Sequence, residues 1–187
     1  MYKTSNDRRF RKNKQAIQRA YIDLVVEKGY QGITVTDVAN RADINRMTFY
    51  AHYETVEDIF AEFVDDMEGY IIDAVSKEEE FTLEKLFSIL NSLMYKEEKF
   101  FRYVAKEGNC NDFREAFRRT IRKLLYQAPK NEDQLKSSIE NDLTATVIAY
   151  AYLDWLAGIY GDVELAVVLT HTSNYLHEHI LHIDYKR

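Results

Sequence analysis

Residues 34–53 read TVTDVANRADINRMTFYAHY, and this stretch decides the fold. Thr34 is followed three residues later by Asp37, a spacing that predicts a capping box at the start of a short helix. A tight turn is expected at residues 43–45, and a second short helix, capped from within the turn, at residues 46–52. Two short helices joined by three residues indicate a helix-turn-helix.

Helical periodicity continues on both sides of this stretch. Apolar residues at helical spacing predict a first helix over about residues 11–28, which ends at Gly29. Thr55 is placed to cap a fourth, longer helix, and five further helical segments follow. Because no segment reads as a strand, we expect an all-α fold of about nine helices. A three-helix helix-turn-helix domain is expected in residues 1–54, and a C-terminal helical bundle in residues 55–187.

Composition excludes several classes of protein. The 187-residue chain is long enough to bury a core without disulfides or metal, and its single Pro and six Gly disfavour an all-β fold. Its one cysteine, Cys110, cannot form an internal disulfide, and no signal-peptide pattern opens the chain, so we expect a cytoplasmic protein. The most apolar run, residues 147–160, is too short to span a bilayer and contains Asp154, so no membrane partner is expected.

Charge is divided unevenly along the chain. The formal net charge of −6 would by itself argue against a nucleic-acid partner. Residues 1–50, however, carry ten basic and five acidic side chains, a net charge of +5, which leaves −11 for the remainder. Residues 54–80 alone hold eleven acids and one lysine. The pattern indicates two functional surfaces, of which the basic one either contacts nucleic acid or is a solvated, frayed N-terminus.

A helix-turn-helix binds DNA by placing its second helix in the major groove. The apolar positions expected to pack its two helices together are Val38, Ala39, Ile44 and Phe49. The positions expected to point away from this core are Thr36, Asn45, Arg46, Thr48, Tyr50 and His52. Their hydroxyls, amide, rings and cation are groups that contact phosphates and base edges. The alternative is that Asn45 and Thr48 serve only as caps and that Tyr50 covers the core.

Residues 12–62 resemble the DNA-binding domain of TetR-family transcriptional regulators. The residues that carry the resemblance are Gly29 and Tyr30, Thr34 to Ala39, Ala42, Ile44 to Tyr53, and Glu57 to Ile59. From the resemblance, the six outward positions named above match the family's DNA-contacting positions. Arg46 is expected to read a base, because a bidentate guanidinium on guanine contributes about 1–3 kcal/mol of discrimination. Tyr50 and His52 are expected to hold phosphates.

Two positions depart from the family's pattern. Asp43 stands where the family often has Gly, and it adopts left-handed backbone geometry less easily. Val56, preceded by Glu54, stands where the family frequently has Lys, so one phosphate contact is missing. We hypothesise that a basic arm ahead of the first helix compensates by reaching along the DNA backbone or into the minor groove. The residues of this arm are Arg8, Arg9, Arg11, Lys12 and Lys14.

The last two helical segments are expected to pair with a second copy of the chain. Residues 147–160 are apolar on nearly every face, so they must be covered on more than one side. The dimer interface is expected at the heptad-like positions Leu165, Leu169, Thr172, Leu176 and Ile183. The resemblance implies a four-helix bundle between two subunits, which suits a palindromic DNA operator. The alternative is a purely intramolecular core.

The resemblance also implies a pocket for a small-molecule effector in the C-terminal domain. The side chains expected to line it are Phe63, Met67, Phe87, Tyr103, Phe117, Tyr150 and Trp155, although residues of these types also form ordinary core. Asp154, a lone acid in the apolar run, is a candidate to recognise a cationic or hydroxylated ligand. Its alternative role is a salt bridge or cap at the edge of the bundle.

No motif indicates catalysis or a cofactor. The chain has no P-loop, no dinucleotide-binding glycine pattern and no Ser-His-Asp pattern. Near Glu178 stand His171, His177, His179 and His182, but the paired Glu-x-x-His motifs of a carboxylate-bridged metal site are absent. We therefore expect no enzyme activity, no metal centre and no cofactor.

These features together predict a homodimeric DNA-binding transcriptional regulator, a repressor released from its operator by a small-molecule effector. One alternative is an activator or co-activator that works through a protein partner. Another is a helical protein-interaction module that has lost DNA binding, which the acidic and apolar residues Glu54 and Val56 motivate.

Overall fold

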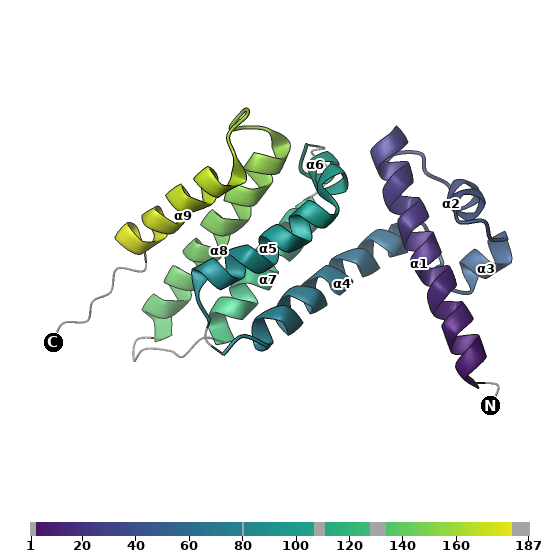
Figure 1. The fold of residues 1–187 in the computed structure, drawn as a ribbon, viewed down its shortest axis with the longest axis horizontal. Coiled ribbons are helices and arrows are strands. Elements are labelled where there is room, and N and C mark those ends of the chain that lie inside the picture. Colours follow the sequence, from purple (N-terminus) through teal and green to yellow (C-terminus); the bar gives the residue numbers. More distant parts are fainter. Residues whose placement is uncertain (1–2, 80, 107–110, 128–133, 181–187) are drawn as a thin grey trace. The chain divides into compact units, whose positions relative to one another are not determined.

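The computed structural model describes residues 3–79, 81–106, 111–127 and 134–180, and within these ranges the chain forms nine α-helices and no strand (Figure 1). The all-α fold expected from the sequence is confirmed. The helices are α1 (Lys3–Lys28), α2 (Val35–Arg41), α3 (Arg46–Tyr50), α4 (Glu57–Ser76), α5 (Leu83–Lys96), α6 (Glu98–Lys106), α7 (Asn111–Gln127), α8 (Gln134–Ala157) and α9 (Leu165–His179).

The chain divides into two compact units, residues 1–67 and 68–187. The sequence placed a boundary at residue 54, ahead of α4, whereas the compact units meet inside this helix. The reason is that the first turns of α4 contribute to the first unit: Val56 and Ile59 are buried, and Glu62 contacts α1. Helix α4 therefore belongs to both units.

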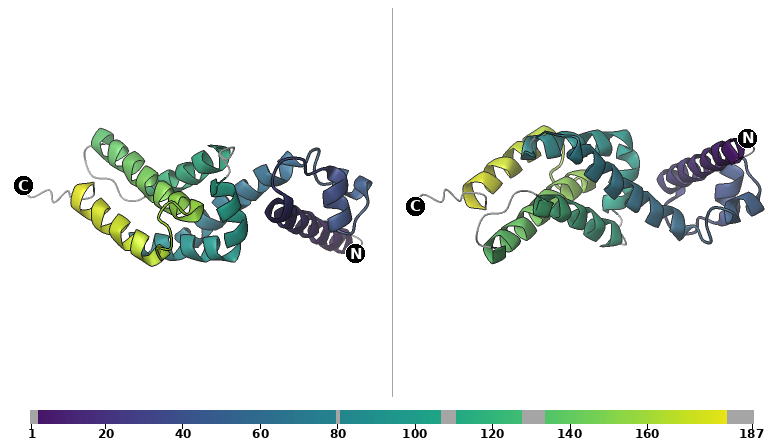
Figure 2. Two further views of the ribbon diagram at one scale, coloured as in Figure 1. Left: turned by 90° about the horizontal axis from the view of Figure 1, so that it is seen from above. Right: turned by 90° about the horizontal axis from the view of Figure 1, so that it is seen from below.

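The first unit is built around α1. Tyr21, Leu24 and Val25 of α1 are buried, as are Val38 of α2 and Phe49 of α3. Both views of Figure 2 show α1 lying beside the α2–α3 pair. Helices as short as α2 and α3 are marginal in water on their own, so packing on α1 stabilises them.

Helix α1 begins earlier than the periodicity predicted, and the basic residues expected ahead of the first helix lie within it. The segment expected to be an arm, which contains Arg8 and Lys14, is helical. The physical reason is that Arg and Lys are good helix formers and no Gly or Pro precedes them to stop the helix. The arm residues Arg8, Arg9, Arg11 and Lys12 are exposed on this helix, and Lys14 is half-buried.

The second unit packs around α8, which contacts α6, α7 and α9. Tyr152 of α8 is fully buried, and its ring lies 6.0 Å from that of Phe117, centroid to centroid. Its hydroxyl donates to the carbonyl oxygen of Phe87 at 3.2 Å and to Oδ1 of Asn91 at 2.7 Å. The apolar run of α8 is thus covered on several sides, as its composition predicted.

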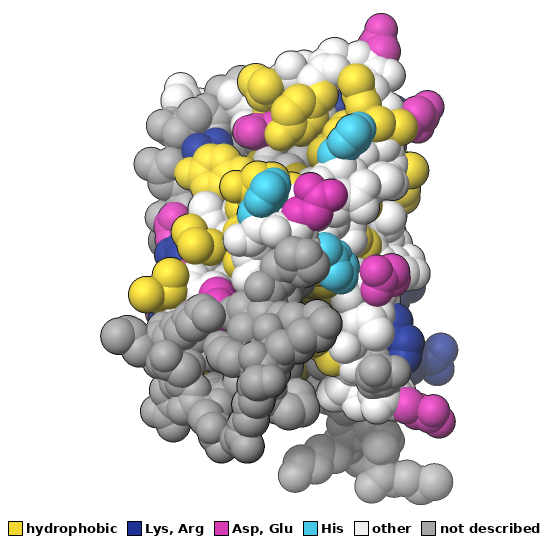
Figure 3. Space-filling view, turned by 90° about the vertical axis from the view of Figure 1, so that its left-hand side faces the viewer, with side chains coloured by type: hydrophobic (Ala, Val, Ile, Leu, Met, Phe, Trp, Pro, Cys, Tyr) yellow, Lys and Arg dark blue, Asp and Glu magenta, His cyan; other side chains and the backbone are white. Residues whose placement is uncertain are grey.

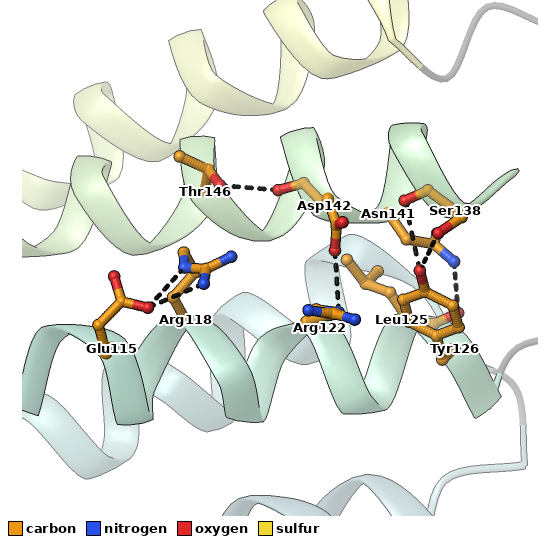
Figure 4. A network of polar contacts seen from close by, with 9 residues as sticks. All are labelled: Glu115, Arg118, Arg122, Leu125, Tyr126, Ser138, Asn141, Asp142 and Thr146. Atoms are coloured by element: carbon orange, nitrogen blue, oxygen red, sulfur yellow. Dashed lines mark hydrogen bonds and ion pairs between the residues drawn. The ribbon is translucent and has the colours of Figure 1, made fainter. Parts of the chain in front are cut away.

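Polar contacts join the end of α7 to the beginning of α8 (Figure 4). Arg122 Nε lies 2.9 Å from Oδ1 of Asp142, and the Tyr126 hydroxyl contacts that of Ser138. These contacts fix the two helices side by side at the edge of the core.

The residues expected to form the dimer interface are buried inside the single chain. Leu165, Leu169, Thr172 and Leu176 are at most 8% exposed, because their stripe packs α9 against α8 of the same chain. Ile183 lies outside the described residues. The heptad-like spacing identified a buried face correctly, and within the single chain this face packs on α8.

No helix among the described residues is both long and apolar enough to cross a membrane.

Replacing Tyr152 with Phe tests the buried polar contact of the core. The change removes the hydroxyl and leaves the Phe87 carbonyl and the Asn91 side chain without this donor, which costs about 1–3 kcal/mol of unfolding free energy. Urea denaturation measures the loss. Tyr70→Phe, at an exposed tyrosine of α4, is the matched control and is expected to be neutral. Equal stability of the two variants would contradict this role for Tyr152.

Candidate nucleic-acid interface

The beginning of α2 is fixed by the predicted capping box. The Thr34 backbone N–H donates to Oδ2 of Asp37 at 2.8 Å, and the Asp37 N–H donates to the Thr34 hydroxyl at 3.2 Å. The pKa of Asp37 is lowered to about 2, first by the hydrogen bond from the Thr34 side chain and then by the one from the Thr34 backbone. Lys28, whose Nζ lies 3.0 Å from Oδ1 of Asp37, lowers it further. The carboxylate therefore stays ionised, and it ties α2 to the end of α1.

The turn between α2 and α3 contains left-handed backbone at Asp43, which has a φ of 53°. This is the position where the sequence has Asp in place of the family's frequent Gly. The Ile44 N–H donates to the Ala39 carbonyl oxygen at 3.0 Å and closes the turn. Asp is among the residues that tolerate this conformation, so the turn keeps its geometry despite the substitution.

Asn45 caps α3 and is joined to Thr48. Oδ1 of Asn45 accepts the Thr48 backbone N–H at 2.7 Å and the Thr48 hydroxyl at 3.0 Å. Asn45 is therefore the cap of α3, and Thr48 is the residue that donates to it. The Asn45 side-chain NH₂ group is not used in this cap, so capping and a contact to DNA are compatible.

One face of α3 consists of Arg46, Met47 and Tyr50. Arg46 Nη2 donates to the Tyr50 hydroxyl at 3.4 Å, and Tyr50 is 51% exposed. Met47 is 83% exposed, and sequence reasoning missed it. The signal that could have found it is an apolar residue next to Arg46 in a helix whose buried position is already filled by Phe49.

Thr36 and His52 complete the set expected to contact DNA. Thr36 is exposed on α2. His52 is half-buried, and its ring lies 4.0 Å from that of Phe10 in α1. Burial, and then the nearby charge of Lys14, lower the pKa of His52 and favour its neutral form. The structure thus exposes Thr36, Asn45, Arg46 and Tyr50, and it half-buries Thr48 and His52.

The beginning of α4 is occupied by the chain's own carboxylate. The Thr55 backbone N–H donates to Oδ2 of Asp58 at 2.7 Å, and the Thr55 hydroxyl accepts the Asp58 N–H at 3.3 Å, which confirms Thr55 as a cap. The Glu54 N–H also donates to Asp58, at 3.1 Å. Val56 is 9% exposed and belongs to the core. An apolar residue at this position therefore stabilises the domain where the family often places a phosphate-binding lysine.

Glu62 of α4 connects three parts of the first unit. Its carboxylate lies 2.7 Å from Lys14 Nζ, accepts a hydrogen bond from Gln18 at 3.4 Å, and accepts another from the hydroxyl of buried Tyr53. Burial alone would raise the pKa of Glu62, but the hydrogen bonds from Lys14 and Tyr53 outweigh it and lower the pKa. Sequence reasoning missed this residue, because nothing local marks a tertiary ion pair.

The residues expected to line an effector pocket do not share one environment. Phe63 and Met67 lie in the first compact unit, whereas the other six lie in the second. Phe87, Phe117 and Trp155 are buried, Tyr103 and Asp154 are half-buried, and Tyr150 is exposed. The rings of Phe87 and Phe117 both pack on Tyr152, so these two residues belong to the packed core.

Asp154 and Trp155 have structural partners. Oδ2 of Asp154 accepts a hydrogen bond from the Tyr160 hydroxyl at 3.5 Å, a contact that is neither the salt bridge nor the cap expected as its alternative role. Trp155 Nε1 donates to the Val163 carbonyl oxygen at 2.9 Å, and the guanidinium of Arg102 lies 4.4 Å from the tryptophan ring. Arg102, which the sequence did not single out, also donates to the Leu156 carbonyl oxygen at 3.3 Å.

The histidines of α9 do not assemble a cluster of metal ligands. Within the described ranges, no group of three or more His, Cys, Asp or Glu side chains is arranged to hold a metal ion. His177 Nδ1 lies 2.8 Å from the Ser173 carbonyl oxygen of the same helix. His182 and Cys110 lie outside the described residues.

Removing the Glu62 carboxylate is expected to destabilise the first unit. Glu62→Ala leaves the buried Tyr53 hydroxyl without its acceptor, which costs about 1–3 kcal/mol of unfolding free energy in urea. Glu62→Gln keeps an acceptor for Tyr53 and is expected to lose less. The exposed Glu54→Ala is the control for removal of one acid. If Glu62→Ala and Glu54→Ala unfold at the same urea concentration, Glu62 does not connect the helices as described.

The sequence of the first unit matches a known family. Residues 17–63 match the model of bacterial regulatory proteins of the tetR family. The HTH-type transcriptional regulator YxbF of Bacillus subtilis is 36% identical over 95 residues, which are 47% of this chain and 25% of YxbF. IcaR of Staphylococcus epidermidis, named as an HTH-type negative transcriptional regulator of the biofilm operon icaADBC, is 28% identical over 76 residues, which are 40% of this chain and 41% of IcaR.

The fold of the whole chain is also similar to a solved structure. A TetR transcriptional regulator from Streptococcus agalactiae aligns over 92% of this chain and 98% of its own, with a TM-score of 0.67 and 21% identity. The chain thus spans less than half the length of the two curated relatives, while the likeness in fold extends over both compact units. Residues 17–63 form a helix-turn-helix domain of the TetR family, and the helices that follow have the fold of TetR-family regulators.

Proposed function

We propose that this chain is a DNA-binding transcriptional regulator that represses genes from a palindromic operator. The observation that carries the proposal is the exposed face of α3, where Arg46 and Tyr50 lie beside each other. Asn45 caps the start of α3, and Thr34 caps the start of α2, so both helices of the pair are fixed at their first turn. The net charge of +5 on residues 1–50 supports attraction to phosphates. Both relatives are named as transcriptional regulators, and one of them is named as a negative regulator, which supports repression.

The proposed complex places α3 in the major groove. Arg46 makes a bidentate contact with a guanine, and Tyr50 contacts a phosphate, as do Thr36 and the free NH₂ group of Asn45. Because His52 is half-buried and its pKa is lowered, it contacts DNA as a neutral ring. The acidic start of α4 stays away from the phosphates, so positive charge comes from the exposed face of α1 in place of a lysine on α4.

The dimer interface is proposed on α8. Ile139, Leu143 and Tyr150 are each at least 42% exposed, and their spacing of four and seven residues places them on one side of the helix. Figure 3 shows hydrophobic side chains gathered on the side of the second unit where α8 and α9 lie in Figure 1. An isologous contact along this stripe would bury it and would join two recognition helices for a palindromic site.

A small-molecule effector is proposed to act through α4. This helix runs from the first compact unit into the second, where Glu68 contacts Lys123 and Thr120 of α7. A ligand that binds the second unit and shifts α7 would therefore move α4, which Glu62 joins to α1 in the first unit. Such a two-state coupling typically amounts to about 1–3 kcal/mol.

A salt titration of DNA binding tests the proposed function. For a duplex selected from a random pool, the logarithm of the binding constant should fall linearly with the logarithm of the salt concentration. The slope should be about −0.9 for each phosphate contact. Arg46→Ala should lower affinity about tenfold or more by loss of a base contact. Arg119→Ala on α7 is the matched control and should bind normally. If no duplex is selected, or if affinity does not change with salt, the chain is better explained as a protein-interaction module.

A charge placed in the α8 stripe tests the dimer. Leu143→Glu is expected to convert the dimer to a folded monomer, because a carboxylate cannot be buried unpaired in an apolar contact. Ser88→Glu, at an exposed position of α5, should remain dimeric. Sedimentation equilibrium measures both. A monomeric wild-type chain, or a Leu143→Glu dimer as tight as the wild type, would contradict the interface.

A further inference from the structure

Met47 is the most exposed large hydrophobic residue in the part of the chain that the structure describes. Its side chain is 83% exposed, on a helix of only five residues. No folding requirement explains an apolar side chain there, because Phe49 already buries the core-facing side of α3. An exposed apolar group of this kind indicates a contact that forms only on binding.

The caps of the helix-turn-helix determine where Met47 points. Asn45 holds the first turn of α3 through Thr48, and Phe49 is fully buried, so rotation of the helix about its axis is restricted. Met47 precedes Tyr50 by three residues, and Arg46 precedes it by four, so both lie next to Tyr50 on the helix surface. Met47 therefore belongs to the same exposed face as the arginine and tyrosine that the proposed function assigns to DNA.

We infer that Met47 reads a thymine in the operator by packing its thioether side chain against the 5-methyl group of the base. This inference rests on the proposed function, because it requires α3 to lie in the major groove. Thymine is the one base that presents a methyl group there, and apolar side chains recognise it by contact. The flexible, polarizable side chain of Met adapts well to such a contact.

The composition of α3 favours a base over a protein surface as the partner of Met47. A protein-docking surface would continue with further apolar side chains, whereas the neighbours of Met47 on α3 are Arg46, Thr48 and Tyr50. A cation and hydroxyls around one apolar group match the mixed pattern of a major-groove edge, in which the thymine methyl lies beside hydrogen-bonding groups.

Replacement of single thymines by deoxyuridine tests this inference, because it removes only the methyl group. In the duplex selected by the wild-type chain, replacement of the contacted thymine should weaken binding about fourfold, the effect of burying one methyl-sized group. Met47→Ala should bind the thymine and uracil duplexes equally. Met47→Leu, which keeps an apolar side chain of similar size, should retain most of the discrimination. Because Met47 is exposed, none of these variants should change the unfolding midpoint.

The outcomes separate this inference from the proposed function. Salt-dependent, sequence-selective binding in which no thymine is sensitive to loss of its methyl group would overturn the role of Met47 and leave the proposed function intact. Equal sensitivity in wild type and Met47→Ala would also overturn it, because another residue would then make the contact. Failure to select any duplex would remove the proposed function and the inference with it.

Discussion

The carboxylate of Glu62 is the contact on which the placement of the recognition helix depends. Helix α3 is five residues long, so its orientation must come from its surroundings. Glu62 binds Lys14 and Gln18 of α1 and the hydroxyl of Tyr53, three residues after the end of α3. Together with the Thr34 and Asn45 caps, this contact joins α1, the turn after α3, and α4 into one unit, and it leaves Arg46, Met47 and Tyr50 facing outward.

Charge in this chain serves both recognition and internal structure. The basic side chains that are exposed on α1 and α3, such as Arg8 and Arg46, are the ones assigned to DNA. Acids of the same unit are used as caps or partners, as with Asp37, Asp58 and Glu62. The excess of negative charge on residues 51–187 has no need to approach phosphate, and it disfavours contact of DNA with any other surface.

Local features were predictable from the sequence, and tertiary partners were not. The two caps at Thr34 and Asn45 and the turn at Asp43 depend on residues a few positions apart, so the sequence was sufficient to predict them. The periodicity of α9 showed that Leu165 and its neighbours are buried, but periodicity does not say whether the covering helix belongs to the same chain. Met47 escaped notice because the side chains considered for contact with DNA were the polar and aromatic ones, and an exposed apolar residue has no mark in the sequence. The Lys14–Glu62 contact joins positions too distant in sequence for any local pattern to reveal.

Hydrogen–deuterium exchange of the full chain, with and without a selected DNA duplex, tests the central claim that the outward face of α3 binds DNA. Protection on binding is expected to be greatest in peptides covering residues 34–53, with a smaller effect along the exposed side of α1. Protection confined to residues 68–187, with residues 34–53 unchanged, would contradict it.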